Sequence, residues 1–307
     1  MGNKKFDVDQ WKAERTAKLA TAKEALQRGL SAIQTGDDWR ALLEGLARLG
    51  KFSPLRYSFA NQVLLVAQGA DLRGVGGFDA WKRAGRSVRK GAKARVVLAP
   101  VTFKVSREDR ETGETIEVLG RMFRTISVFD YSQTEGVELK APELPRVDAP
   151  EAFENSIETL RAVALALEGS PVSAITFVES SLNGANGWYD RLSREIVVVT
   201  GSRSRADIFR TLVHETAHAI LHGNADHHER PVKEVEAEST AFVVAHALGL
   251  ETGCYSFPYV AIWAQNGGDA AEKIAARVGD RIMHAAGLIL DALTGAEQEA
   301  PALRQSA

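Results

Sequence analysis

The chain has 307 residues, of which 45% are hydrophobic and 25% are charged; these values are ordinary for a folded globular protein and exclude a disordered or fibrous one. Its formal net charge of −2 hides an asymmetry, because residues 1–147 hold 26 Lys and Arg against 18 Asp and Glu, a net charge of +8, whereas the remaining residues hold 12 against 22, a net charge of −10. A basic half joined to an acidic half predicts two domains with two tasks, and we expect the basic one to face a polyanion.

The composition also bears on the compartment. No run of about 18 apolar residues occurs, so we expect no transmembrane helix and no membrane partner. Residues 1–11 are polar and charged and lack the apolar core of a secretory signal. Cys254 is the one cysteine, which excludes an intrachain disulfide and is typical of a reducing compartment. We therefore expect a cytoplasmic protein.

The basic half is predicted to begin with helices and to end in a small sheet. Leucine and alanine recur at helical spacing within residues 7–50, and a further helix is predicted over 58–68. A glycine-rich connection then leads into a basic segment, 78–95, which starts as a short helix or turn. The predicted strands are 95–100, 101–105 and 121–129, with a charged loop over 107–120 before the last of them.

The acidic half is predicted to combine helices with short strands. Helices are predicted over 151–168, 204–223 and 232–248, and Ser204 with Asp207 three residues on is an N-terminal capping pattern. The predicted strands, 175–179 and 195–200, flank a turn-rich segment. The predicted organisation is a domain over 1–140, a proline-containing linker over 141–150, a second domain over 151–295 and a disordered tail over 296–307.

The clearest chemical signal is His214-Glu215-Thr216-Ala217-His218. Two histidines four residues apart lie one turn apart on the same helix face, so both imidazoles can reach one zinc ion at about 2.0–2.1 Å. Glu215, rotated about 100° around the axis, can hold the metal-bound water as general base. The pattern predicts a zinc metallopeptidase-type site with Glu215 as its catalytic residue, and the strand over 195–200 is the expected edge strand for substrate. Two surface histidines on an ordinary helix are the alternative.

A catalytic zinc needs a third protein ligand, and the helix over 232–248 offers three glutamates. The helix becomes apolar on all sides beyond its first turns, so a glutamate near its buried entry is expected to need a partner. Glu236 is the preferred ligand, followed by Glu238 and then Glu234. The alternative is that two of the three are solvated and stabilise the helix N-terminus. His222 is less favoured, because a histidine also suits a helix C-terminus electrostatically.

The segment WKRAGRSVRKGAKAR, residues 81–95, contains seven cations and no acidic residue. Cations bind phosphates and aromatic rings stack on bases, so this composition predicts binding of single-stranded nucleic acid. A solvated basic surface is the alternative. The expected contacts are Phe78, Trp81, Lys82, Arg83, Arg86, Arg89, Lys90 and Lys93.

The segments SFANQVLLVAQGA and VGGFDAWKRAGRSVRKGAKARVVLAP resemble the N-terminal single-stranded-DNA-binding domain of ArdC-type antirestriction proteins. The matching positions are Asn61, Gly77-Phe78, Trp81, Gly85-Arg86, Val88, Lys90-Gly91 and Ala99-Pro100. Ala92 departs from the pattern, since an acidic residue is usual there. The resemblance adds Asn61 to the expected DNA-binding residues.

The acidic half is similar to the zincin-like metallopeptidase domain of the same family. HETAHAILHG matches its metal helix, EVEAESTAFVVAHALGL its third-ligand helix and YSFPYVAIW its trailing segment. A Glu-Ala-x-x-x-Ala pattern maps to Glu236-Ala237 with Ala241, so the resemblance implies that His214, His218 and Glu236 hold the metal. It also implies an α+β fold in both domains and protection of incoming plasmid or phage DNA from host restriction.

Three functions therefore compete at this point. The first is a single-stranded-DNA-binding antirestriction protein with a zinc-dependent peptidase domain, which acts on restriction enzyme subunits or another protein; Mn²⁺ or another divalent ion can take the place of zinc. The second is a non-proteolytic DNA-binding protein whose metal domain is structural or masks a restriction enzyme. The third is a peptidase that cleaves a repressor, which the absence of an obvious helix-turn-helix pattern disfavours.

Overall fold

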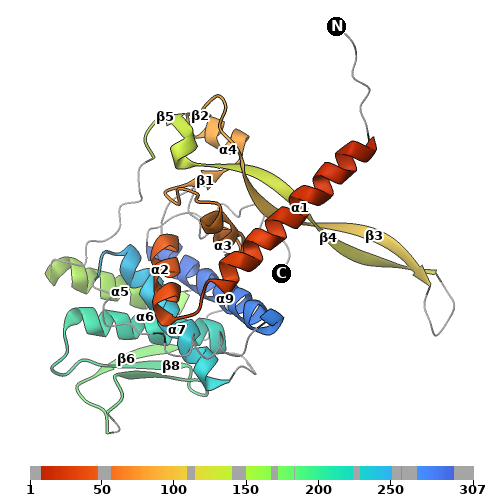
Figure 1. Cartoon of the computed structure of the whole chain (residues 1–307). Coiled ribbons are helices and arrows are strands. Elements are labelled where there is room, and N and C mark those ends of the chain that lie inside the picture. Colours follow the sequence, from red (N-terminus) through yellow and green to blue (C-terminus); the bar gives the residue numbers. More distant parts are fainter. Residues whose placement is uncertain are drawn as a thin grey trace.

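The computed structural model describes residues 8–47, 57–108, 115–139, 150–166, 172–182, 184–223, 229–250, 257 and 268–293 (Figure 1). The predicted disordered tail and all but the last residue of the predicted linker lie outside the described residues. The division of the chain into two domains at this linker stays a prediction. No helix among the described residues is long and apolar enough to cross a membrane.

The described residues of the first half begin with three helices, as predicted within 7–50 and over 58–68. They are α1 (Val8–Ser31), α2 (Gly36–Leu46) and α3 (Phe59–Ala67). A capping box starts α2, because Thr35 Oγ1 accepts the backbone N–H of Asp38 at 3.1 Å while the Asp38 carboxylate accepts the Thr35 N–H at 2.9 Å.

The sheet of this half is a long hairpin of β3 (Arg95–Glu108) and β4 (Thr115–Asp130), with the short β1 (Val75–Gly76) on the other side of β4. Figure 1 shows β3 and β4 reaching beyond the body of the protein as a two-stranded arm beside α1. The strands are longer than predicted, and β3 continues through Pro100 instead of breaking there. Because β3 is an edge strand of this sheet, a proline costs it no hydrogen bond to a further strand.

The basic segment forms α4 (Phe78–Arg83) and then β2 (Arg86–Val88), which pairs with β5 (Thr134–Gly136). The backbones approach closely at the start of β2, since a Cβ on Gly136 would lie 2.4 Å from the carbonyl oxygen of Gly85. Both glycines also have positive φ, of 130° and 73°, which a side chain disfavours.

The second half begins with α5 (Pro150–Ala166) and a three-stranded sheet of order β6-β8-β7. The predicted strands are β6 (Ala174–Val178) and β8 (Glu195–Val199), which are parallel. The expectation that the second of them is the edge strand was wrong. It is central, and the two edges of the described sheet are β6 and β7 (Gly187–Asp190), of which β7 is a four-residue strand within the segment predicted to be turns. Val197 and Val198 are buried on opposite faces of β8, as a central strand permits.

The described residues of this half also form three helices: α6 (Arg205–His222), α7 (Arg230–Ala247) and α9 (Gly268–Leu293). The predicted cap of α6 is confirmed, because Ser204 Oγ accepts the backbone N–H of Asp207 at 3.1 Å. The predicted helix over 232–248 is confirmed as α7, which packs against both α6 and α9.

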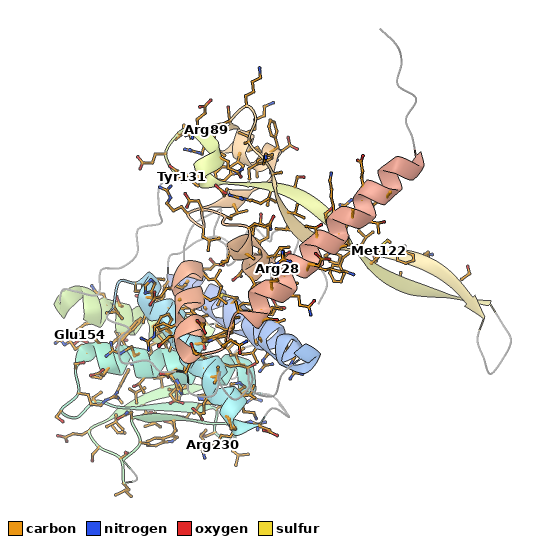
Figure 2. All side chains as sticks on the ribbon, in the orientation of Figure 1. Arg28, Arg89, Met122, Tyr131, Glu154 and Arg230 are labelled. Carbon is orange, nitrogen blue, oxygen red and sulfur yellow. The ribbon has the colours of Figure 1, made fainter. Side chains whose placement is uncertain are left out.

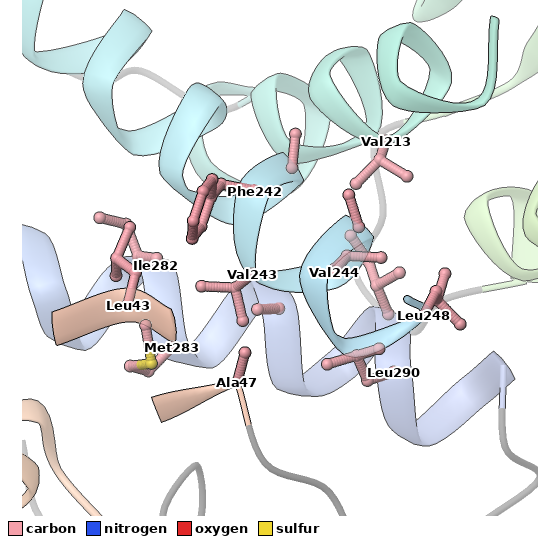
Figure 3. Packing of buried hydrophobic residues seen from close by; sticks show 14 of the residues in the cluster. Leu43, Ala47, Val213, Phe242, Val243, Val244, Leu248, Ile282, Met283 and Leu290 are labelled. Atoms are coloured by element: carbon pink, nitrogen blue, oxygen red, sulfur yellow. The ribbon is translucent and has the colours of Figure 1, made fainter. Parts of the chain in front are cut away.

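The largest hydrophobic cluster joins the two halves of the chain. Side chains of α2, among them Leu43, pack together with Val243 of α7 and Met283 of α9 (Figure 3). Inside this cluster the indole N–H of Trp39, a fully buried residue of α2, donates to Ser239 Oγ of α7 at 2.9 Å. The fold is mixed α+β, as predicted, and the helix that carries the three candidate glutamates is packed against the N-terminal helices.

Candidate functional site

Two of the three histidines of α6, His214 and His218, converge on one point, as their spacing predicts. The Nε2 atoms of His214 and His218 are 3.0 Å apart. Glu234 Oε2, from α7, lies 3.7 Å from the first and 3.6 Å from the second. Ligands at zinc's preferred bond lengths and tetrahedral angles are separated by about 3.3–3.4 Å. Two imidazole nitrogens and one carboxylate oxygen at these separations therefore fit a divalent ion.

Glu236, the preferred third ligand, does not join this group. Its side chain is fully buried, as expected, but its Oε2 atom meets His222 Nε2 at 2.8 Å and its Oε1 atom lies 2.8 Å from Arg281 Nε of α9. Two residues along an α-helix are rotated by about 200°, so Glu234 and Glu236 face different neighbours. The structure thus brings Glu234, the least favoured of the three glutamates, to the histidines.

The third glutamate of α7 also reaches the site. Glu238 Oε2 is 3.2 Å from His214 Nδ1, the ring nitrogen that faces away from His218. A carboxylate in this place orients a metal-binding imidazole and makes it more basic. Glu234 and Glu238 are four residues apart and so share one helix face, as His214 and His218 do. This matched spacing on two helices is the sequence signal that could have identified both glutamates.

The carboxylates around His214 and His218 favour a positive charge at the site. Burial lowers the pKa of His214, but hydrogen bonds to Glu234 and Glu238 outweigh it and raise the pKa to about 10. The pKa of Glu234 is held well below its usual range by its hydrogen bonds to His214 and His218. Burial lowers the pKa of His218. A proton on His214 thus balances the carboxylates in the metal-free protein, and a divalent ion would supply that positive charge instead.

Glu215 lies between the two histidines, as the motif predicts, and only 7% of it is exposed. Burial raises its pKa to about 7, the range that suits a general base. The backbone of Tyr189 in β7 hydrogen-bonds to it and opposes the shift. The edge strand approaches closely here, because a Cβ on Gly187 would lie 2.6 Å from Thr211 Cγ2 and 3.3 Å from Glu215 Cγ. The catalytic candidate therefore lies beside the edge of a sheet.

Three of the residues expected to bind DNA are structural. Trp81 is fully buried and donates its indole N–H to Phe129 O at 2.9 Å. Arg86 is 6% exposed, donates to Thr134 Oγ1 at 2.8 Å and lies over the ring of Tyr131. A buried ring or guanidinium is not accessible to DNA in this conformation, so neither residue is part of the exposed basic surface. Aromatic and basic composition does not reveal burial.

Asn61 has a structural role as well. Its side-chain amide donates to Leu98 O and accepts the Leu98 N–H, both at 2.8 Å, and so clamps α3 to β3. The remaining expected contacts are exposed and lie around α4 and β2. They are Phe78, Lys82, Arg83, Arg89, Lys90 and Lys93. Figure 2 shows Arg89 at the opposite end of the molecule from Arg230, the first residue of α7.

Comparisons with known proteins agree with the N-terminal resemblance. Residues 12–129 match the family described as the N-terminal domain of anti-restriction factor ArdC. An uncharacterized protein of Bacillus anthracis is 26% identical over 291 residues, a match that covers 82% of this chain and 48% of that protein. The chain thus spans about half the length of this curated relative.

Two crystal structures of the antirestriction protein ArdC from plasmid R388 are similar to this chain. The metal-free structure has a TM-score of 0.46 at 20% identity and covers 77% of this chain and 84% of that one. The Mn(II)-bound structure has a TM-score of 0.45 at 18% identity, with coverage of 77% and 85%. Residues 12–129 of the chain therefore form a domain of the family described as the N-terminal domain of anti-restriction factor ArdC.

Proposed function

We propose that this protein is a DNA-binding antirestriction protein whose C-terminal half is a metal-dependent peptidase. The observation that carries the second part is the convergence of His214, His218 and Glu234 beside the buried Glu215. The proposed metal ligands are these two histidines and Glu234, and the proposed catalytic residue is Glu215. Zinc is the first candidate ion, and manganese is a second, since the R388 relative was crystallised with Mn(II).

The chemistry follows from the residues present. A bound divalent ion would polarise a substrate carbonyl and lower the pKa of a water molecule. Glu215, with a pKa near 7 and limited access to solvent, is suited to take the proton of that water and to pass it on. Glu238 would hold the ring of His214 from the far side.

The position of β7 favours a polypeptide as the substrate. This strand is one of the two edges of its sheet, and it runs beside α6 at the level of Glu215. An extended peptide can add to such an edge through main-chain hydrogen bonds. Binding there would place a peptide bond next to the proposed catalytic residue. A host restriction enzyme subunit is the substrate that the family function suggests.

The proposed DNA-binding surface is the exposed group of cations around α4 and β2, with Phe78 beside it. Phe78 is 58% exposed, and Lys82 and Arg83 lie one turn further along the same helix. Together with Arg89, Lys90 and Lys93 they offer phosphate contacts around a ring that can stack on a base. Single-stranded DNA is the proposed ligand.

A protection assay tests the proposal. Unmodified DNA enters a restricting host that carries wild-type protein, Glu215→Gln, or a variant with Arg89, Lys90 and Lys93 changed to Ala, and the metal content of each purified protein is measured. We expect Glu215→Gln to keep its metal and to lose protection. Glu158→Gln, on the exposed face of α5, is the matched control and should protect normally.

The outcomes separate the competing functions. If Glu215→Gln keeps both metal and protection, the peptidase proposal fails and the metal domain is a scaffold. Loss of protection in the triple variant alone would then assign the function to DNA binding. Cleavage of a co-expressed repressor, absent with Glu215→Gln, would instead support a regulatory peptidase.

A further inference from the structure

A chain of polar contacts runs from the proposed metal site into the protein interior. His218 Nδ1 lies 3.0 Å from His222 Nδ1, and His222 Nε2 lies 2.8 Å from Glu236 Oε2. Glu236 Oε1 in turn lies 2.8 Å from Arg281 Nε, and Arg281 Nη2 donates to Leu221 O at 2.6 Å. The chain therefore links three helices, α6, α7 and α9, behind the imidazole of His218.

The chemistry of these groups gives every proton in the chain one direction. The Arg281 guanidinium forms an ion pair with the Glu236 carboxylate, and a carboxylate beside this positive charge accepts a hydrogen bond from its other neighbour, His222. His222 then donates from Nε2, and the tautomer that does so has its acceptor at Nδ1. His218 must donate from its own Nδ1 to that acceptor. The lone pair of His218 consequently sits on Nε2, the atom that faces His214 and Glu234.

We propose that His222, Glu236 and Arg281 are positioning residues that hold His218 in the tautomer and ring orientation needed to bind the metal. This inference rests on the proposed metal site and deepens it, since it assigns work to three residues outside the ligand set. Glu238 does the same for His214 through a single contact. Each metal-binding imidazole is thus supported from behind by a carboxylate of α7, directly in one case and through His222 in the other.

Burial supports a role beyond surface electrostatics. The side chain of Glu236 has no exposed area, and that of His222 is 5% exposed. A carboxylate is costly to bury, and its ion pair with Arg281 offsets part of that cost. An ion pair alone, however, would not require a histidine between the carboxylate and His218. The intermediate ring is what carries the orientation of Glu236 to the metal site.

The test measures metal binding by the full chain. Metal-free wild type, His222→Leu, Glu236→Gln and Ser239→Ala are titrated with Zn²⁺ against a competing chelator, and the melting temperature of each metal-free protein is recorded. Ser239→Ala is the matched control, because it removes the buried hydrogen bond between Ser239 of α7 and Trp39. It leaves the polar contacts from His218 to Arg281 intact. We expect the dissociation constant to rise about 10- to 100-fold for His222→Leu and Glu236→Gln. Ser239→Ala should stay within about threefold of wild type.

A rescue variant separates positioning from simple packing. In His222→Gln the amide can still accept from His218 and donate to Glu236, so zinc affinity should recover most of what His222→Leu loses. Equal affinities for His222→Leu and His222→Gln, or losses no larger than that of Ser239→Ala, would overturn the positioning role while the metal site stands. A wild-type protein that binds no zinc would overturn both proposals. The visible spectrum of the Co²⁺-substituted proteins provides a second readout of ligand geometry, and it should change in His222→Leu but not in Ser239→Ala.

Discussion

Phe59 of α3 packs against Gly279 of α9 so closely that no side chain fits between them. A Cβ on Gly279 would lie 2.2 to 2.4 Å from three ring atoms of Phe59. The next residue, Asp280, accepts the backbone N–H of Phe59, and the one after it, Arg281, pairs with Glu236. Three consecutive residues of α9 thus meet the N-terminal helices on one side and the proposed metal-site support on the other.

Gly279→Ala should destabilise the contact between the two halves. The added methyl group would force the buried ring of Phe59 or the helix itself to move, and overpacking of this kind costs about 1–3 kcal/mol. Chemical denaturation followed by tryptophan fluorescence measures the effect. Gly77→Ala is the control, because its Cβ meets open space, and it should change the free energy of unfolding by less than about 0.5 kcal/mol. Equal stability of the two variants would contradict the close contact.

Asp280 is predicted to cap α3 from another helix. Its Oδ1 atom accepts the first N–H of α3 at 2.5 Å, a group that has no partner within its own helix. Asp280→Ala should therefore cost about 1 kcal/mol in the free energy of unfolding, as loss of a helix cap does. Asp280→Asn keeps an acceptor oxygen and should cost much less. If Asp280→Ala and Asp280→Asn lower the free energy of unfolding equally, the charge of Asp280 stabilises the protein and its acceptor oxygen at the start of α3 does not.

The sequence was sufficient to predict that His214 and His218 converge, but not which glutamate of α7 lies beside them. The spacing of His214 and His218 places both on one face of α6, and the Ser204 cap sets where that helix begins. Both signals depend only on local helix geometry. The rotation of α7 relative to α6 depends instead on side-chain packing across the core, which no local pattern reports. Burial of Glu236 was predicted correctly, yet its partners proved to be His222 and Arg281.

In the sheets, too, local sequence patterns predicted some strands and missed those that depend on tertiary contacts. Strands were predicted at β6 and β8, whereas β7, which is four residues long and contains a glycine, lies in a segment predicted to be turns and pairs with β8. In the basic half, composition predicted a polyanion-binding segment but not that Trp81 and Arg86 turn inward. Burial depends on which strands meet, so the exposed contacts could not be separated from the structural ones.

Phe78 and Trp81 should respond to substitution in opposite ways. Phe78→Ala removes an exposed ring and should weaken binding to single-stranded DNA by about 1–3 kcal/mol, with little effect on stability. Trp81→Ala leaves a cavity and an unpaired carbonyl, and should cost about 3–5 kcal/mol of unfolding free energy. Fluorescence anisotropy with a labelled oligonucleotide and thermal denaturation measure the two effects. Normal DNA affinity in Phe78→Ala would exclude its ring as a stacking platform.

The metal-free protein should lose stability as the pH rises above neutrality. The pKa of His214 is about 10 in the folded protein and about 6.5 when unfolded, so its protonation stabilises the fold fully below pH about 6.5 and ceases to do so as the pH passes 10. Zinc competes with that proton, so its apparent affinity should increase between pH 6 and 8. Melting temperatures measured across this range, with and without Zn²⁺, check both statements. A His214→Asn variant should show a flatter profile, and an unchanged slope would refute the assignment.

Glu234 and Glu238 should differ in what they contribute to the metal. Glu234→Gln removes the carboxylate that lies 3.6–3.7 Å from both Nε2 atoms, so zinc binding should fall by well over 100-fold. Glu238→Gln can still hydrogen-bond His214 Nδ1 and should lose only about tenfold. Isothermal titration of the two metal-free proteins measures the difference. Because Glu236→Gln acts only through His222, its loss should lie below that of Glu234→Gln; the reverse order would restore Glu236 as the third ligand.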